Sequence, residues 1–466
     1  MASHVIAHWN PEDKSSWERS GHSVAQRNLW LSIPALTLAF AVWMVWSAVV
    51  VNLPLVGFKY STNQLFWLAA LPALCGATLR IFYSFAVPIF GGRRWTAVST
   101  ATLLVPALGI GFAVQSPATP YEAMVALALL CGLGGGNFAS SMANISFFFP
   151  KAQKGYALGM NAGLGNLGVS VVQFVVPLVI TAGVFGSLGG EPATVTKAGQ
   201  TSSMWLQNAG FIWVPFILAS AIAAWFGMND LAEAKASFAD QAVIFKRKHN
   251  WLMCWLYLGT FGSFIGYSAG FPLLIKNQFP GVNALQYAWL GPLVGALVRP
   301  AGGWLSDKLG GARVTFWNFI AMALGVYAVL QFLPHAGSGA VAASSGNFTG
   351  FLIAFMALFA FAGIGNGSTF RMIPVIFQTE RQRAAAKTPA AQEQAVKDAN
   401  KEAAAVLGFS SAIGAYGGFF IPKSYGTSLA LTGSPDAALY AFIVFYVTCI
   451  ATTWWYYSRK NAPMPC

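Results

Sequence analysis

Two arginines lie inside strongly apolar stretches of the sequence. Arg80 is the single charged residue of LPALCGATLRIFYSFAVPIF, residues 71–90, and Arg299 lies in GALVRPAGG, residues 295–303. A guanidinium group stays charged at any relevant pH, and its planar fork of N–H donors matches planar or forked oxyanions. Two such groups in apolar surroundings predict binding of a small anion, if the fold carries both to the interior.

The composition predicts that these surroundings are a lipid bilayer. Of the 466 residues, 56% are hydrophobic and only 9% are charged, whereas soluble domains carry roughly 25% charged residues. A transmembrane helix needs about 20 apolar residues. Twelve runs of this kind occur, at 29–53, 62–88, 95–115, 122–149, 155–183, 205–227, 250–274, 284–306, 312–334, 349–378, 402–431 and 436–458. The expected fold is an all-α integral membrane protein with twelve transmembrane helices.

The two arginines occupy equivalent places in an internal repeat. Arg80 is followed eleven residues later by GGRRWT, which begins at Gly91, and Arg299 is followed eleven residues later by GGARVT, which begins at Gly310. Eleven residues of helix span roughly 16 Å at about 1.5 Å per residue, half of a hydrocarbon core about 30 Å thick. Both arginines are therefore predicted near the bilayer midplane, one in each of two parallel six-helix halves.

Glycines repeat in the same way, since Gly159, Gly165 and Gly168 have the spacing of Gly408, Gly414 and Gly417. The predicted segments are a cytoplasmic N-terminal segment 1–28, an N-terminal half 29–228, a cytoplasmic linker 229–249, a C-terminal half 250–458 and a cytoplasmic tail 459–466. The C-terminal half includes a polar cytoplasmic loop, 379–401, for which a short surface helix is expected.

The basic net charge of +13 predicts orientation and not binding to nucleic acid. With the N-terminus inside, twenty of the 27 Lys and Arg residues fall in cytoplasmic segments and four on or near the other side. This distribution follows the positive-inside rule and predicts cytoplasmic termini. The other three are Arg80, Arg299 and Arg371. The first 28 residues lack the features of a signal peptide.

A protein counter-charge for the two arginines is not visible in the sequence. All 14 acidic residues are expected in loops, tails or the ends of spans, and the five histidines lie outside the spans. The simplest counter-ion is therefore the substrate. The alternative is an arginine bonded to backbone carbonyls of a neighbouring broken helix. Arg371 has no repeat partner, and either a gate or supporting role, or a snorkelling or carbonyl-bonded role, fits it.

The segment GGWLSDKLGGARVTF resembles the signature loop of the major facilitator superfamily. The matching residues are Gly303, Asp307, Lys308, Gly310 and Arg313. Asp307 is expected to pair with Arg313 or with a helix N-terminus as a conformational latch. In this superfamily the substrate site lies between two parallel six-helix halves near the midplane.

Two glycine-rich segments, GLGGGNF and GIGNGSTF, resemble the signature pair of the nitrate/nitrite porter family within that superfamily. Their glycines are Gly132, Gly134, Gly136, Gly363, Gly365 and Gly367, and they predict close helix packing. Further stretches, including RIFYSFAVPIFGGRRWTA and GAYGGFFIPKSYGTSLALTGSP, resemble its bacterial NarK-type branch. The resemblance implies exchange of nitrate for nitrite across the bacterial inner membrane.

The resemblance also implies a set of binding residues. Arg80 and Arg299 match the two substrate arginines of the family. The aromatic residues that enclose the planar anion match Phe138 and Phe261, and the polar donors match Asn166 and Tyr257. The residue types alone would favour ordinary packing for the two phenylalanines and an interhelical hydrogen bond for the asparagine.

Exchange is the expected mechanism, because two facing arginines without an anion would oppose closure of the transporter. The alternative is a proton-coupled nitrate symporter of the same fold. A membrane enzyme or an anion sensor lacks a visible catalytic constellation or signalling domain. No cofactor and no metal is expected, and the five cysteines (Cys75, Cys131, Cys254, Cys449 and Cys466) show no metal-binding spacing. The expected partners are nitrate, nitrite and the lipid bilayer, with the chain as a monomer.

Overall fold

The chain folds into two compact units of helices. The computed structural model describes residues 4–197, 199–232, 234, 242–335 and 345–466. Unit 1 comprises Met1–Ala236, Phe271–Leu273 and Asn283–Trp289, and unit 2 comprises Ser237–Gly270, Leu274–Val282 and Leu290–Cys466. Within the predicted linker 229–249, residues 233 and 235–241 lie outside the described residues.

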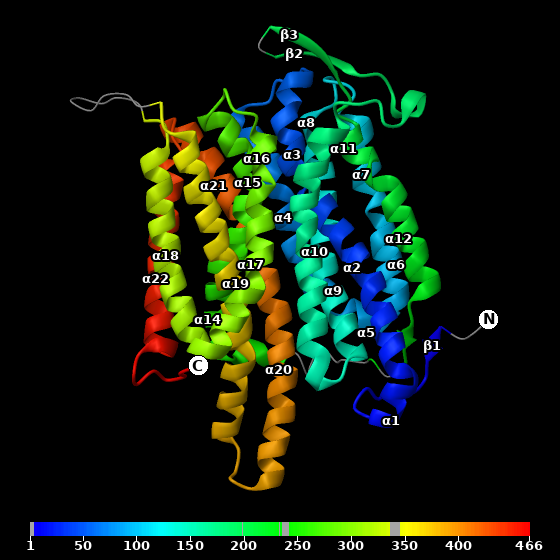
Figure 1. The fold of residues 1–466 in the computed structure, drawn as a ribbon, viewed down its shortest axis with the longest axis vertical. Coiled ribbons are helices and arrows are strands. Elements are labelled where there is room, and N and C mark those ends of the chain that lie inside the picture. Colours follow the sequence, from blue (N-terminus) through cyan, green and yellow to red (C-terminus); the bar gives the residue numbers. More distant parts are fainter. Residues whose placement is uncertain (1–3, 198, 233, 235–241, 336–344) are drawn as a thin grey trace. The chain divides into compact units, whose positions relative to one another are not determined.

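Unit 1 is a bundle of long helices with two very small sheets (Figure 1). Its elements are β1 (Val5–Ile6), α1 (Lys14–Ser16), η1 (Trp17–Gly21), α2 (His22–Met44), α3 (Trp46–Asn52), η2 (Leu53–Val56), α4 (Thr62–Tyr83), α5 (Ala86–Phe90), α6 (Gly92–Thr102), α7 (Leu104–Ala113), α8 (Tyr121–Leu130), α9 (Gly132–Phe148), α10 (Lys151–Val179), η3 (Gly186–Gly189), β2 (Ala193–Lys197), β3 (Gln200–Met204), α11 (Asn208–Phe211), α12 (Trp213–Gly227), β4 (Asp230–Leu231) and α16 (Ala284–Ala288). Strands β1 and β4 pair in parallel, and β2 and β3 form an antiparallel hairpin.

Unit 2 consists of helices and helical turns in its described residues. Its elements are η4 (Val243–Lys246), α14 (Lys248–Tyr257), η5 (Leu258–Gly262), α15 (Ser263–Gln278, with Phe271–Leu273 counted in unit 1), α17 (Leu290–Leu309), α18 (Gly311–Phe332), α19 (Phe348–Ala384), α20 (Pro389–Ala415), α21 (Gly417–Thr432), α22 (Asp436–Thr453) and η6 (Trp454–Ser458).

The predicted membrane-spanning fold is confirmed. Among the described residues, eleven helical stretches are long and apolar enough to cross a bilayer. The remaining predicted span, 284–306, corresponds to α16 and the 20-residue helix α17. Arg299, Asp307 and Lys308 make α17 less apolar than the other spans.

The helices continue past the apolar runs that mark the bilayer. The first long helix begins at Lys14, where the Asp13 carboxylate accepts a hydrogen bond from the backbone N–H of Ser15 at 3.0 Å. The predicted surface helix within 379–401 is wrong: α19 continues to Ala384, α20 begins at Pro389, and both extend below the other helices of unit 2 in Figure 1. Ala, Gln, Lys and Glu are strong helix formers, so this polar segment prolongs both spans.

Asp230, which follows the last long helix of unit 1, is hydrogen bonded both to α6 and to the N-terminal strand β1. Asp230 Oδ1 accepts a hydrogen bond from the backbone N–H of Arg93 at 2.8 Å, and Oδ2 accepts one from Arg93 Nε at 3.2 Å. The backbone N–H of Asp230 in turn donates to the carbonyl of His4 at 2.9 Å, within the β1–β4 pair. The Asp230 carboxylate thus caps α6, because it satisfies a backbone donor in the first turn of that helix.

Unit 2 repeats this arrangement with a different acceptor. Gly91 and Gly310, which precede α6 and α18, have φ values of 88° and 89°, a conformation that strongly favours glycine. The backbone N–H of Ala312, which is equivalent to Arg93 in the repeat, donates to the main-chain oxygen of Cys466 at 3.0 Å. In each unit, the helix after the positive-φ glycine is therefore capped by an oxygen from the segment that follows the unit's last span.

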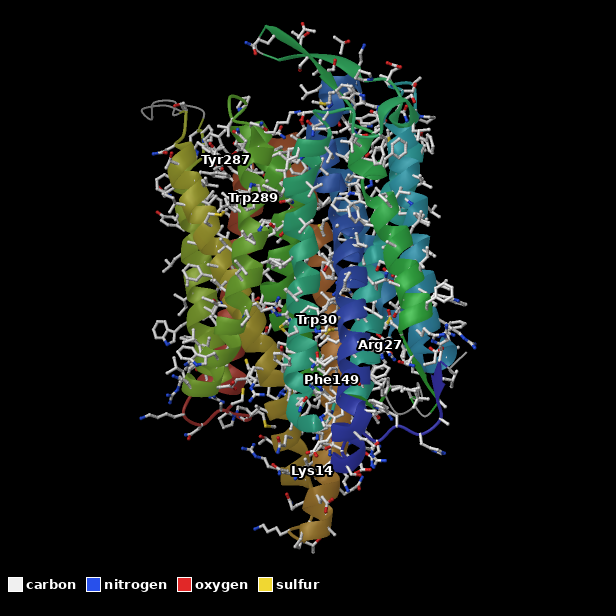
Figure 2. The ribbon with its side chains drawn as sticks, turned by 45° about the vertical axis from the view of Figure 1, so that its right-hand side comes forward. Lys14, Arg27, Trp30, Phe149, Tyr287 and Trp289 are labelled. Atoms are coloured by element: carbon white, nitrogen blue, oxygen red, sulfur yellow. The ribbon has the colours of Figure 1, made fainter. Side chains whose placement is uncertain are left out.

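The segment Asn283–Trp289 packs on α10 within unit 1 (Figure 2). Ser170 Oγ donates a hydrogen bond to the carbonyl of Trp289 at 2.9 Å, and the ring centroids of Phe174 and Trp289 lie 5.1 Å apart. This contact holds the helical segment that directly precedes α17, the helix that carries Arg299.

Candidate functional site

Arg80 is completely buried in unit 1 and is surrounded by aromatic rings. Its guanidinium carbon lies 4.7 Å from the ring centroid of Phe138, 5.0 Å from that of Trp43 and 5.9 Å from that of Phe40. Its Nε donates a hydrogen bond to the carbonyl of Gly135 at 2.8 Å. Aromatic faces attract a guanidinium group most strongly where water is excluded, so these contacts fix the plane of the side chain.

Close helix packing produces this aromatic pocket. Helix α4, which carries Arg80, begins with a reciprocal capping box between Ser61 and Gln64. Trp43 on α2 donates its indole N–H to the carbonyl of Pro72 on α4 at 2.8 Å. A Cβ atom at Gly135 would lie 2.6 Å from Trp43 and 2.8 Å from the Cα atom of Gly76. Glycine in α9 is therefore what allows Trp43 to reach the arginine.

The six predicted signature glycines have this packing role in both units. Each faces an adjacent element, which is α2 or α4 in unit 1 and α17, α18 or η5 in unit 2. Gly367 lies against the carbonyl of Arg299, and Gly365 lies against Asn318 and Thr260. The glycine-rich segments therefore bring the arginine-bearing helices close to their neighbours.

Arg299 is 9% exposed in unit 2. Its guanidinium carbon lies 5.3 Å from the ring centroid of Phe370 on α19. Its Nη1 is buried and has no hydrogen-bond partner among the residues that the structure describes. An unpaired buried donor of a charged group is unfavourable, so a ligand acceptor at this atom would stabilise the protein.

Tyr257 and Phe261 stack on each other, next to a residue that is hydrogen bonded to α19. Tyr257 ends α14 and Phe261 lies in the π-helical turn η5, with their ring centroids 5.4 Å apart and their planes inclined by 23°. Thr260 Oγ1 and Thr369 Oγ1 on α19 are hydrogen bonded at 3.0 Å. Thr369 precedes Phe370, so this bond connects η5 to the helix that covers Arg299.

Asn166 on α10 is 1% exposed, and neither atom of its amide has a hydrogen-bond partner among the described residues. The interhelical hydrogen bond that its residue type suggests is thus absent from that part of the chain. Gly165 and Gly168, on either side of it in α10, pack against Leu36 and Phe40 of α2. Asn166 is therefore a buried donor and acceptor on a helix next to the one that supplies Phe40 and Trp43.

The signature loop corrects one predicted pair. Asp307 pairs with Arg371, whose Nε lies 2.5 Å from Oδ1, and Arg313 is exposed instead. The two side chains of the pair are 52% and 55% exposed, and Lys308 Nζ lies 4.1 Å from the Trp304 ring centroid. The predicted pairing of Asp307 with Arg313 or a helix N-terminus is therefore wrong. The actual partner, Arg371, lies on α19, 64 residues after Asp307 in the sequence. A Cβ atom added to Gly303 would meet nothing within 4 Å among the described residues.

The aromatic residues Trp43, Phe40 and Phe370 are missing from the predicted site. Since the chain contains 37 Phe, 17 Trp and 14 Tyr residues, a ring close to an arginine cannot be recognised by its type. Asp230 and Glu402, which fall within the general expectation that acidic residues lie in loops, tails or the ends of spans, are buried. Asp230 pairs with Arg93, and Glu402 of α20 pairs with Arg247 at 3.0 Å and with Arg381.

No group of three or more His, Cys, Asp or Glu side chains able to hold a metal ion lies in the part of the chain that the structure describes. The chemistry available at the two arginines is therefore that of charged and neutral hydrogen-bond donors set among aromatic faces. Such a set binds a flat anion through N–H donors at its edge and rings at its faces.

Comparison with known proteins relates this arrangement to a family. The profile of the Major Facilitator Superfamily matches residues 35–422. The chain is 54% identical over 458 residues to the nitrate/nitrite transporter NarU of Salmonella typhimurium, and the match covers 98% of this chain and 97% of the relative. It is 44% identical over 466 residues to the probable nitrate/nitrite antiporter NarK2 of Thermus thermophilus, with 99% and 98% covered.

Solved structures give the same fold. A crystal structure of a D-xylose-proton symporter matches with a TM-score of 0.65 at 14% identity and covers 95% of this chain and 98% of its own. A mutant of the nucleoside transporter NupG matches with a TM-score of 0.60 at 13% identity, with 92% and 98% covered. These similarities confirm the predicted fold, and the chain is a transporter and not an enzyme. The chain belongs to the major facilitator superfamily and, within it, to the nitrate/nitrite porters of NarK type.

Proposed function

We propose that the protein carries nitrate and nitrite across the bacterial inner membrane by exchanging one anion for the other. The observation that carries this proposal is a buried arginine at the equivalent position of each repeat, in each case beside an aromatic ring: Arg80 lies beside Phe138 and Arg299 beside Phe370. The names of the 54% and 44% identical relatives, a nitrate/nitrite transporter and a probable nitrate/nitrite antiporter, support the choice of anions.

In this proposal each half supplies one arginine to the anion, and Phe138, Phe261, Asn166 and Tyr257 complete the site. Nitrate and nitrite are flat, so their faces suit aromatic rings and their oxygen atoms suit guanidinium and amide N–H donors. Arg299 Nη1 and the Asn166 amide, which have no hydrogen-bond partner in the described part of the chain, are donors that such an anion would satisfy. The bilayer surrounds a monomer with both termini in the cytoplasm.

Exchange follows from the charge of the site. Two arginines without an anion repel each other in a poorly solvated interior, and a bound anion relieves part of that repulsion. The transition between outward-open and inward-open forms is then favourable only when the site is loaded. The buried acids among the described residues, Asp230 and Glu402, already have arginine partners, which favours exchange over a proton-coupled symporter.

A counterflow assay in liposomes tests the proposed function. Purified protein is reconstituted, isotope-labelled nitrate is added outside, and uptake is followed with nitrite, nitrate or neither anion inside. We expect rapid uptake with either anion inside and background uptake with neither. We also expect an acidic exterior to drive no nitrate into anion-free liposomes.

Three other results would each contradict a different part of the proposal. Nitrate accumulation in anion-free liposomes under a pH gradient would replace exchange by proton symport. Uptake with nitrate inside but not with nitrite inside would remove nitrite as a substrate. Background uptake in every arm, from protein that retains a cooperative thermal transition, would overturn nitrate transport itself.

A further inference from the structure

A π-helical turn interrupts the helix that carries two of the proposed site residues. The turn, η5, covers Leu258–Gly262 between α14 and α15 and contains Phe261. A π turn adds one residue to an α-helix, and each residue of an α-helix corresponds to a rotation of about 100°. The turn therefore sets the direction in which Phe261 points, and something must favour it over regular α-helix.

Three hydroxyl groups form a hydrogen-bonded chain that ends on this turn. Ser263 Oγ donates to the carbonyl of Gly259 at 2.6 Å. Ser263 Oγ and Tyr446 Oη are 2.6 Å apart, and so are Tyr446 Oη and Tyr267 Oη. A hydroxyl group has one proton to donate. Since Ser263 gives its proton to Gly259, Tyr446 must donate to Ser263 and Tyr267 must donate to Tyr446.

The chain is buried along its whole length. Tyr267 is 0% exposed, Tyr446 is 1% exposed and Ser263 is 2% exposed. Water cannot replace a missing link at such burial, so removal of one hydroxyl group takes a hydrogen bond away from its neighbour in the chain. The effect on the turn should be largest for the hydroxyl that touches it and should decrease along the chain.

Other contacts of η5 involve Gly262 and Thr260. Gly262 lies against the backbone of Gly417, and a Cβ atom on Gly262 would be 2.8 Å from the carbonyl of Gly414. Thr260 is bonded to Thr369 on α19. These contacts fix where the turn sits, whereas the bond from Ser263 acts on a carbonyl group inside the turn.

We propose that this hydroxyl chain holds η5 in its π-helical form and thereby positions Phe261 and Tyr257 for the anion. Ser263, Tyr446 and Tyr267 are then positioning residues for substrate binding, although none is assigned to contact substrate. This inference rests on the proposed function, because its measured effect is on nitrate affinity.

The test compares Ser263→Ala, Tyr446→Phe and Tyr267→Phe in the full-length protein. The apparent Kd for nitrate is taken from the increase of Tm with nitrate concentration in detergent. We expect Kd to rise about tenfold for Ser263→Ala, about threefold for Tyr446→Phe and less than about twofold for Tyr267→Phe, since loss of one buried hydrogen bond corresponds to about a factor of ten.

Tyr457→Phe is the matched control. Tyr457 also lies at the last span, is 1% exposed, and its hydroxyl group is hydrogen bonded to His249 Nδ1 at 2.9 Å. The control should lower Tm without nitrate as much as Tyr446→Phe does, because both lose a buried tyrosine hydrogen bond. It should leave the Kd for nitrate unchanged, because it lies outside the chain.

The outcomes distinguish this inference from the proposed function. If nitrate does not raise the Tm of the wild-type protein, the proposed function fails. If the wild-type protein responds and all four variants share its Kd, or if Tyr267→Phe has the largest effect, the positioning role is overturned. Should Ser263→Ala fail to fold, the comparison of Tyr446→Phe with Tyr457→Phe decides. Ser263→Thr keeps the hydroxyl group and should therefore keep the wild-type Kd.

Discussion

Replacement of Arg80 by lysine is expected to reduce nitrate–nitrite counterflow on the order of 100-fold, although the charge is kept. Lysine loses the Nε–H donor that bonds to Gly135 at 2.8 Å and the planar face that lies against Phe138 and Trp43. A hydrogen bond from a charged group contributes about 1.5–3 kcal/mol, and about 1.4 kcal/mol corresponds to a factor of ten. Arg299→Lys should have an effect of the same order.

Arg94→Lys is the control for this experiment. Its side chain is 59% exposed, and its Nε lies 3.7 Å from Asp230. An exposed ion pair contributes about 0–1 kcal/mol, so counterflow should stay within about twofold of wild type. Counterflow within about threefold of wild type for Arg80→Lys, in protein that is folded and inserted, would remove Arg80 from the proposed binding site.

The second large effect is expected for Asp230→Asn, and it concerns stability. The carboxylate of Asp230 and the guanidinium of Arg93 are each 9% exposed, at 3.2 Å from each other. Removing one member of a buried ion pair destabilises a protein by about 3–5 kcal/mol. The Tm in detergent should fall by roughly 5–10 °C for a unit of this size, as measured by thermal unfolding.

Asp307→Asn provides the contrast at the equivalent end of unit 2. Asp307 and Arg371 are 52% and 55% exposed, and exposed pairs contribute about 0–1 kcal/mol. We expect its Tm to fall by less than about 2 °C. Equal losses for Asp230→Asn and Asp307→Asn would mean that burial does not determine the strength of these pairs.

The spans were predictable because apolar runs of bilayer length are a strong signal. The equal spacing from Arg80 to Gly91 and from Arg299 to Gly310 was also visible, and the structure gives both glycines the same positive φ. The ends of the helices were less predictable, because hydropathy marks where lipid ends and not where a helix ends. The extension of α19 to Ala384 is an example.

The contacts that shape the candidate site depend on helix packing and could not be predicted. Trp43 reaches Arg80 only because α9 has a glycine at position 135 where α2 crosses it. Asp307 has an arginine six residues away in Arg313, yet its partner is Arg371 on another helix. The π-helical turn at Leu258–Gly262 has no marker in its residues, because the bond that holds it comes from outside it.

The pairing of β1 with β4 has a consequence for biosynthesis. The carbonyl of His4 accepts its hydrogen bond from the backbone N–H of Asp230, which lies 226 residues later in the chain (230 − 4). At about 5–20 residues per second, synthesis of this length takes roughly 11–45 s. Until Asp230 emerges from the ribosome, α6 has no cap and the first strand has no neighbour. These contacts of the first half can therefore form only after its last residues have been synthesised.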